Sequence, residues 1–297
     1  MKVAVIGAGH MGRYHAEKFA RLPGVEVAAI VDRDPARAPI ADFRKVLDRV
    51  EAAVIAVPTD LHHEVAAACL ERGLHVLVEK PIAATLAQAD ELIDLASKQQ
   101  VVLQVGHVER YNQAFQALTA RMDRPVFIDA ERLSGFKQRG AEVDVVLDLM
   151  IHDLDLAIAL ARGEVLDVSA CGFRVLTRDI DIANARIEFA NGCVANLSAS
   201  RVSQSPVRKL RVFQPGLYVS ADLQGGKLRY VRQSGGAIEE TEERHEGGDA
   251  LAAQAEAFVS AIQEQKPAGV DGAEGRRALK LALDVGRLVR ERLSRFE

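Results

Sequence analysis

The feature that most constrains the fold of this chain is an apolar segment that leads directly into a glycine-rich turn. Lys2–Ile6 has the composition of a buried strand and is followed by the turn Gly7-Ala-Gly-His-Met-Gly12. A second apolar segment, Val25–Val31, ends at Asp32, twenty residues after the last of these glycines. Strand, glycine turn, helix, strand and terminal acid in this order predict a βαβ unit that binds a dinucleotide at the start of its first helix.

Each glycine of the turn has a separate physical task in such a unit. Gly7 permits the tight turn, Gly9 lets the backbone approach a pyrophosphate, and Gly12 lets the helix pack closely against the strand. The helix that begins near His10 directs its N-terminal N–H groups and the positive end of its dipole toward the phosphates. We therefore expect the pyrophosphate of the cofactor at residues 7–12.

Asp32 indicates which dinucleotide is bound. A carboxylate at the end of the second strand accepts hydrogen bonds from the adenosine ribose hydroxyls of NAD, and its charge repels the 2′-phosphate of NADP. Arg33 and Arg37 are close enough in the sequence to weaken this preference. NAD is therefore the expected cofactor, and NADP is the alternative.

Composition and charge place the chain among ordinary globular proteins. Its 297 residues are enough for two domains, 48% of them are hydrophobic, and the formal net charge is −4. No basic excess indicates nucleic acid, and no apolar run reaches the roughly 18 residues of a membrane span. The chain starts on a strand rather than on a charged and then apolar leader, so we expect a cytoplasmic protein. Cys69, Cys171 and Cys193 form no C-x-x-C pair, and we expect buried thiols and no metal site.

The first part of the chain alternates strands and helices, which predicts a parallel sheet with helices on both faces. After the two strands named above, the predicted strands are Ala52–Val57, His75–Val78 and Val101–Val105. The predicted helices are His10–Arg21, Leu61–Arg72 and Thr85–Gln99, the last with Thr85 as its N-cap.

One segment interrupts this alternation. Only nineteen residues separate Asp32 from Ala52, whereas a crossover with its helix alone needs about 10–12 residues. We therefore expect a turn around Pro35–Pro39, a short strand Ile40–Phe43 and a short helix Arg44–Val50. Such a short connection leaves the adenosine end of the site unusually open.

From about Pro125 the pattern changes to short alternating segments typical of a mostly antiparallel sheet. The predicted strands are Val126–Leu133, Val165–Leu176, Asp181–Ala190, Val194–Val202, Arg208–Phe213 and Leu217–Leu223, with a hairpin turn at Asn191-Gly192. The predicted helices are Asp144–Arg162, Ala250–Gln265 and Ala273–Arg295, and a hairpin and mobile loop are expected at Gly225–Gly248. The sequence thus predicts an α/β protein with a Rossmann domain at 1–118 and an α+β domain with an open mixed sheet at 119–297.

Three further stretches carry residues suited to chemistry. Lys80 directly follows an apolar strand, at the edge where open α/β sheets bind ligands, so it either polarises a substrate oxygen or is simply solvated. Asp148 and His152 share a face of a predicted helix, so the carboxylate can hold the imidazole in one tautomer, as a general base requires. This pair would equally suit a metal site or a structural histidine. The segment His107–Asn112 fits either substrate contact or interdomain packing.

These stretches, in this order, resemble the glucose–fructose oxidoreductase/inositol dehydrogenase (Gfo/Idh/MocA) family over nearly the whole chain. The resemblance rests on G-A-G-H-M-G at 7–12, P-T-D-L-H at 58–62, G-L-H-V at 73–76, E-K-P at 79–81 and D-x-x-x-H at 148–152. It implies that His152 is the acid/base, that Lys80 anchors and polarises the reacting hydroxyl, and that Asp148 orients them. The cofactor contacts that it implies are Gly7, Gly9, His10, Met11, Gly12, Asp32, Arg33, Pro58, Thr59, His62, Glu79 and Lys80.

The resemblance also implies a substrate class. G-H-V-E-R-Y-N at 106–112 is most similar to the branch that acts on nucleotide sugars, the UDP-N-acetylglucosamine 3-dehydrogenases. It implies NAD-dependent oxidation at C3 of a UDP-N-acetylhexosamine; a free-polyol dehydrogenase of the inositol type and a non-catalytic NAD(H)-binding regulator are the alternatives. The implied substrate contacts are His107, Arg110, Tyr111 and Asn112. Gln113 and Met150 stand where family members often have Pro and Gly.

The strands of the second domain indicate self-association. Arg186-Ile-Glu-Phe and Asn196-Leu-Ser-Ala-Ser alternate polar and apolar residues, so one face of this sheet has no helix assigned to it. The resemblance likewise implies an open sheet that often builds dimers or tetramers. We expect a homodimer or homotetramer through the C-terminal sheet, with no nucleic-acid or membrane partner.

Overall fold

The chain forms two compact units in the computed structural model, which describes residues 1–136, 143–245 and 247–295. Unit 1 comprises Met1–Tyr111 and Asp249–Leu279, and unit 2 comprises Asn112–Gly248 and Lys280–Glu297. Neither unit is contiguous in sequence, whereas the sequence predicted a single division after residue 118. The difference arises because the chain returns to unit 1 at Asp249.

Unit 1 is built on a five-stranded, entirely parallel sheet in the order β2-β1-β3-β4-β5. Its strands are β1 (Lys2–Ile6), β2 (Glu26–Val31), β3 (Ala52–Ile55), β4 (His75–Glu79) and β5 (Leu103–Gly106). Its helices are α1 (His10–Phe19), α2 (His62–Glu71), α3 (Leu86–Gln99), α6 (Ala250–Gln263) and the first part of α7 (Gly272–Leu293). The strand order reverses between β1 and β3, which places a ligand site at the carboxyl ends of these strands.

The core of unit 1 lies between the sheet and the helices α1 and α6, which lie side by side. Val5 and Leu77 are fully buried there and belong to one cluster with Phe19 of α1 and Phe258 of α6. The two phenylalanine rings meet edge to face with their centroids 6.2 Å apart. Helices α2 and α3 also pack against each other. Helices on both faces explain why the strands are continuous apolar runs.

The segment directly after Asp32 is not helical, which agrees with the turn predicted around Pro35–Pro39. Residues 33–39 form turns and bends, and Ile40 pairs with Val31 in a single parallel bridge rather than in a strand. Two 3₁₀ turns, η1 (Phe43–Lys45) and η2 (Leu47–Arg49), replace the expected short α-helix. The crossover from β2 to β3 is therefore built almost entirely from turns.

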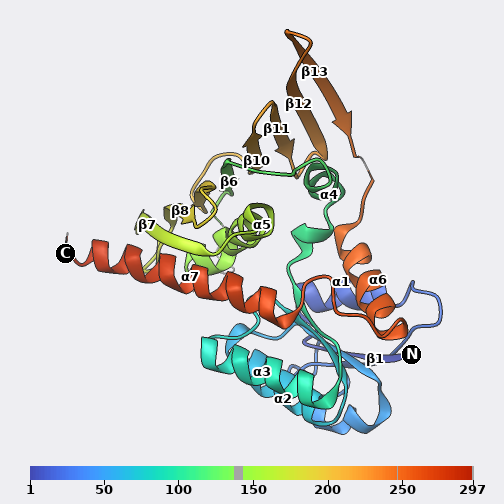
Figure 1. Cartoon of the computed structure of the whole chain (residues 1–297). Coiled ribbons are helices and arrows are strands. Elements are labelled where there is room, and N and C mark those ends of the chain that lie inside the picture. Colours follow the sequence, from blue (N-terminus) through green and yellow to red (C-terminus); the bar gives the residue numbers. More distant parts are fainter. Residues whose placement is uncertain (137–142, 246, 296–297) are drawn as a thin grey trace. The chain divides into compact units, whose positions relative to one another are not determined.

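Unit 2 contains an eight-stranded sheet in the order β13-β12-β11-β10-β6-β9-β8-β7. Neighbouring strands are antiparallel except β6 and β9, which confirms the predicted mixed, mostly antiparallel sheet. The strands are β6 (Phe127–Leu133), β7 (Val165–Phe173), β8 (Ile182–Phe189), β9 (Val194–Ser200), β10 (Val207–Gln214), β11 (Leu217–Asp222), β12 (Lys227–Ser234) and β13 (Ala237–Arg244). The predicted hairpin after Gly225 is β12–β13, at one edge of the sheet (Figure 1).

The two faces of this sheet differ. On one face Ala185 and Leu197 are fully buried, and α5 (Ile151–Ala161) contacts β6 and β9. On the other face Arg186 and Asn196 are exposed or partly exposed, as their alternation predicts. A short helix that the sequence did not predict, α4 (Gln113–Thr119), contacts β11 and β12. Across the described ranges, no helix combines the length and the apolar character needed to cross a membrane.

Candidate active site

The glycine turn after β1 leaves room for a phosphate at one glycine only. A Cβ on Gly7 would lie 2.5 Å from the Ala56 carbonyl oxygen, and a Cβ on Gly12 would lie 1.7 Å from the Gly7 carbonyl oxygen. Gly7 also has a φ of +97°, which favours glycine. A Cβ on Gly9, in contrast, would have nothing within 4 Å. Gly7 and Gly12 therefore serve the packing of the turn, whereas Gly9 faces open space.

The start of α1 fits an anionic ligand. Gly9 is its N-cap, no side chain caps the helix, and its first turn contains no acidic residue. The N-terminal N–H groups and the positive dipole end are therefore not neutralised by a side chain of this helix. This arrangement fits the pyrophosphate of a dinucleotide.

Asp32 is held beside the same turn. Its Oδ2 accepts a hydrogen bond from the Ala8 N–H at 2.7 Å, and its Oδ1 accepts one from the Asp34 N–H at 2.9 Å. A carboxylate oxygen can accept more than one hydrogen bond, so both oxygens keep capacity for ribose hydroxyls. Arg37, one of the two basic residues that weakened the preference for NAD, pairs with Asp34 at 3.1 Å.

The other residues predicted to contact the cofactor follow the carboxyl ends of β1, β2 and β3 and are exposed or partly exposed: His10, Met11, Arg33, Pro58 and Thr59. Their placement at one edge of the sheet agrees with a shared ligand. Direct contact with the cofactor stays a prediction.

Lys80 follows β4 and is partly exposed between buried neighbours, Glu79 on one side and Pro81 on the other. Glu79 Oε1 accepts a hydrogen bond of 2.7 Å from His15 Nε2, which belongs to α1. Burial alone would raise the pKa of Glu79, but the hydrogen bond and charge of His15, with the nearby Lys80, lower it below its usual value. Glu79 is therefore a buried carboxylate next to a lysine at the carboxyl end of β4.

His62, also predicted to contact the cofactor, makes two contacts with the protein backbone, and its cofactor contact stays a prediction. Its side chain is almost fully buried, with Nδ1 2.8 Å from the Pro81 carbonyl oxygen and Nε2 3.0 Å from the Val57 carbonyl oxygen. Both ring nitrogens are therefore directed at the backbone rather than at a ligand. The ring joins the segment after β3 to the segment after Lys80.

In unit 2, the helix that carries Asp148 and His152 is not regular. Asp144 caps its start by accepting hydrogen bonds from the Val146 and Leu147 N–H groups, both at 3.0 Å. Residues Val146–Met150 then form a π-helical turn, and α5 begins at the next residue. The predicted helix exists, but the expectation of uniform α-helical spacing between Asp148 and His152 is wrong. Such π turns often occur at functional sites.

Exposure separates the predicted catalytic pair from its acidic neighbours. Asp148 and His152 are partly exposed, whereas Asp153 and Asp155 are buried. Asp153 makes a bidentate ion pair with Arg132 of β6, with both N–O distances 2.9 Å and both side chains about 5% exposed. This planar pair joins α5 to β6 at the residue next to His152. Within the described ranges, no group of three or more His, Cys, Asp or Glu side chains could hold a metal ion.

Several side chains of the segment after β5 are buried or have protein partners. His107 and Tyr111 are buried, and Arg110 Nη2 lies 3.4 Å from Glu274 Oε1. Asn112 Oδ1 caps α4 by accepting hydrogen bonds from the Ala114 and Phe115 N–H groups, and its Nδ2 donates to the Leu223 carbonyl at 2.9 Å. Both polar atoms of the Asn112 side chain thus have protein partners, and its assignment to the substrate stays a prediction.

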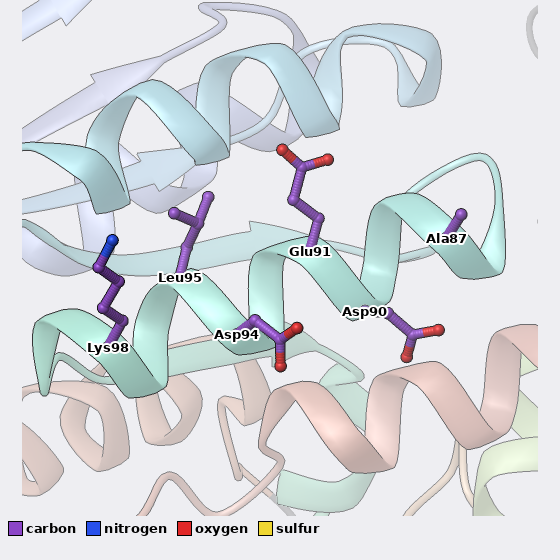
Figure 2. A pocket seen from close by; sticks show the side chains of 6 residues that line it. All are labelled: Ala87, Asp90, Glu91, Asp94, Leu95 and Lys98. Carbon is purple, nitrogen blue, oxygen red and sulfur yellow. The ribbon is translucent and has the colours of Figure 1, made fainter.

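A surface hollow of about 510 Å³ along α3 does not suit an anionic ligand. Figure 2 shows that its lining comes from one helix, with Asp90 and Asp94 on one side and Glu91 on the other. Arg276 binds Asp90 and holds the pKa of that carboxyl below its usual value. Its lining contains three carboxylates and one cation, Lys98, so its net charge is negative and does not suit a dinucleotide or a nucleotide sugar.

Comparison with known proteins identifies the family. A model described as "Oxidoreductase family, NAD-binding Rossmann fold" matches residues 1–107, and a GFO/IDH/MocA C-terminal domain matches residues 115–214. UDP-N-acetylglucosamine 3-dehydrogenase from Acidithiobacillus ferrooxidans is 38% identical over 302 residues, which cover 96% of each chain. The chain belongs to the Gfo/Idh/MocA family. A solved structure of that A. ferrooxidans enzyme matches with a TM-score of 0.93 and 37% identity, over 97% of each chain.

Other relatives have different named substrates. Myo-inositol 2-dehydrogenase from Thermotoga maritima is 24% identical over 99% of this chain and 98% of its own. Scyllo-inositol dehydrogenase from Lactobacillus casei, solved with bound NAD(H) and scyllo-inositol, shares the fold with a TM-score of 0.85 at 17% identity. This Gfo/Idh/MocA protein is therefore an oxidoreductase, a dehydrogenase of CH–OH groups with a nicotinamide cofactor.

Several residues that shape the site were missed from the sequence. His15 lies three residues after Gly12 on the buried side of α1, and a histidine among apolar positions was the only signal of it. The π turn and the partner of Asp153 left no local signal, because both depend on contacts between distant segments.

Proposed function

We propose that this protein oxidises, with NAD as hydride acceptor, the C3 hydroxyl of a UDP-N-acetylhexosamine such as UDP-N-acetylglucosamine. The observation that carries the proposal is the similarity to the A. ferrooxidans 3-dehydrogenase, which extends over nearly the whole length of both chains. Asp32 supports NAD over NADP because its carboxylate is fixed beside the glycine turn.

The roles of the side chains follow from their chemistry. The nicotinamide ring, when bound, supplies the hydride acceptor. His152 takes the proton of the C3 hydroxyl, and Lys80 donates a hydrogen bond to the same oxygen as it becomes a carbonyl. Asp148 orients the imidazole of His152. The alcohol thus loses a proton to His152 and a hydride to the cofactor, which leaves a 3-keto sugar.

The substrate contacts are proposed from the segment after β5. The guanidinium of Arg110 suits a diphosphate, and His107 and Tyr111 suit the sugar and its ring substituents. Asn112, which also caps α4, completes the proposed set.

A substrate panel tests the proposal. Purified protein with NAD is given UDP-N-acetylglucosamine, UDP-N-acetylgalactosamine or myo-inositol, and NADH is followed by absorbance while mass spectrometry detects a 3-keto product. We expect turnover of a UDP-N-acetylhexosamine, a loss of at least about 10²-fold in Lys80→Ala, and no change in Lys98→Ala, a matched control on α3. Turnover of inositol alone would favour the polyol alternative. NADH binding without turnover of any sugar would favour a regulator.

Self-association through the sheet of unit 2 is proposed on its uncovered face. A polar hollow of about 400 Å³ there is lined by Arg186, Asn196 and Arg292, among others. We propose a homodimer or homotetramer through this face, in the cytoplasm. Light scattering after size exclusion tests it, and a monomer at micromolar concentration would contradict it.

A further inference from the structure

Lys80 is flanked in the chain by two residues that are each held by a buried imidazole. On its N-terminal side, Glu79 Oε1 accepts a hydrogen bond of 2.7 Å from His15 of α1. On its C-terminal side, the Pro81 carbonyl oxygen lies 2.8 Å from Nδ1 of His62, the first residue of α2. Both rings are almost fully buried.

The carboxylate of Glu79 is hydrogen-bonded to His15 and is also closely packed on another side. Gly106 of β5 lies beside it, and a Cβ there would be only 3.1 Å from Glu79 Oε2. In the described residues, His15 Nδ1 is buried without a hydrogen-bond partner, and Nε2 carries a proton because the carboxylate that it contacts can only accept. That proton is directed at Glu79, so His15 defines the position of the carboxylate.

A neutral His62 can donate a hydrogen bond to only one of the two carbonyl oxygens that it contacts, those of Pro81 and Val57. Carbonyl oxygens only accept, and a neutral imidazole has one N–H. Burial lowers the pKa of His62, although the two carbonyl contacts oppose this, so the neutral ring is favoured. The shorter contact is to Pro81, and we place the proton on Nδ1.

We propose that His15 and His62 are positioning residues that fix the backbone on both sides of Lys80 and so direct its ammonium group toward the reacting hydroxyl. The proposal rests on the catalytic role proposed above for Lys80. Neither imidazole needs to touch substrate or cofactor, because each acts through a residue adjacent to Lys80. The hydrogen bond from His15 to Glu79 also connects the residue before Lys80 to α1, the helix that begins at the glycine turn of residues 7–12.

Paired substitutions separate these contacts from general packing. Glutamine at position 15 can place an amide N–H near the original Nε2, whereas leucine fills the space without a donor. At position 62, asparagine retains a donor near Nδ1 and Pro81, whereas glutamine retains one near Nε2 and Val57. We expect kcat to fall about 10²-fold in His15→Leu and His62→Gln, and by less than about 10-fold in His15→Gln and His62→Asn. His63→Asn, which changes the neighbouring histidine on α2, is the control and should retain the full kcat.

Two further readouts distinguish positioning from a structural role. In a Lys80→Ala background, His15→Leu and His62→Gln should lower kcat no further, because they act through the lysine. In protein labelled with ¹⁵N-lysine, the Lys80 amide resonance, assigned by its loss in Lys80→Arg, should shift in His15→Leu and His62→Gln. The lysine resonances other than that of Lys18, which lies on α1 near His15, should stay in place.

The NMR measurement needs no substrate, so it tests the inference even if UDP-sugars are not turned over, in which case only the proposed function fails. An unmoved Lys80 resonance, equal shifts of all lysine resonances, or additive losses of kcat would each overturn the inference. A larger loss in His62→Asn than in His62→Gln would overturn the assignment to Pro81.

Discussion

Two alanine substitutions in the glycine turn should separate cofactor binding from folding. Gly9→Ala places a methyl group in space with nothing within 4 Å, whereas Gly12→Ala places one 1.7 Å from the Gly7 carbonyl oxygen. The φ of Gly9 is −67°, which alanine adopts without strain. The same chemical change therefore meets open space at one position and the backbone of the turn at the other.

The magnitudes follow from these contacts. A Cβ cannot approach within 3.0 Å of a backbone oxygen, so Gly12→Ala must move α1 or the turn by more than an ångström, at a cost of at least about 1–3 kcal/mol. For Gly9→Ala, the poorer N-cap costs about 0.5–1 kcal/mol, and the lower entropy of the unfolded chain offsets a similar amount. Its free energy of unfolding should stay within about 1 kcal/mol of wild type, whereas its affinity for NADH should fall at least about 10-fold, because the methyl group occupies the approach to the pyrophosphate.

NADH fluorescence titration and thermal unfolding without cofactor measure the two effects. We expect Gly9→Ala to keep its melting temperature and to lose NADH affinity, and Gly12→Ala to lose melting temperature. Wild-type NADH affinity in Gly9→Ala would refute the placement of the pyrophosphate at this turn. A wild-type melting temperature in Gly12→Ala would refute the close packing of α1 against the turn.

The remaining predictions concern unit 2. His152→Ala should lower kcat by about 10²–10⁴-fold without changing NADH affinity, and unchanged turnover would contradict its role as acid/base. Arg132→Met leaves the carboxylate of Asp153 buried without its ion-pair partner and should destabilise the protein by about 3–5 kcal/mol in denaturant unfolding. The double variant Arg132→Met/Asp153→Leu should regain most of that stability but not the turnover. Burial raises the pKa of Asp181, but hydrogen bonds from the N–H groups of residues 175–177 outweigh it and hold the pKa below its usual value. The stability that Asp181 contributes is therefore present above its unfolded pKa of about 4 and is lost as the pH falls through the lower folded value; Asp181→Asn should flatten this loss in acid unfolding.

The parts of the fold that were predictable are those whose signals are local. The β1–turn–α1 unit matches the structure because apolar run, glycines and helix start lie within one short stretch. The N-cap of α3 is another case: Thr85 accepts from the Gln88 N–H, and Gln88 reaches back to the Thr85 N–H, which confirms the cap and adds a capping box. Gly73, with a φ of +72°, ends α2 as predicted.

The parts that could not be predicted depend on contacts between distant segments. His15 and Glu79 are 64 residues apart, and no local pattern in either strand or helix indicates that they meet. The return of the chain to unit 1 depends on the packing of α6 against α1, through Phe258 and Phe19. Asn112 shows the converse case: a residue of the motif predicted for substrate contact also caps a helix, and the sequence analysis did not predict this cap.

In both units a proposed catalytic side chain is next in sequence to a buried, paired acid. Lys80 follows Glu79, which is bonded to a buried imidazole, and His152 precedes Asp153, which is paired with Arg132. A buried ion pair adds little net stability, because the loss of hydration offsets most of the attraction. The geometry of the pair is nevertheless directional. A bidentate guanidinium–carboxylate contact is compatible with a single rotational orientation of α5 about its axis, whereas apolar contacts are compatible with several. When Arg132 and Asp153 are both replaced by apolar residues, the stability of the protein should therefore be largely retained, whereas the orientation of His152 should be lost. A double variant with wild-type turnover would mean that packing alone directs His152, and that the ion pair has no part in catalysis.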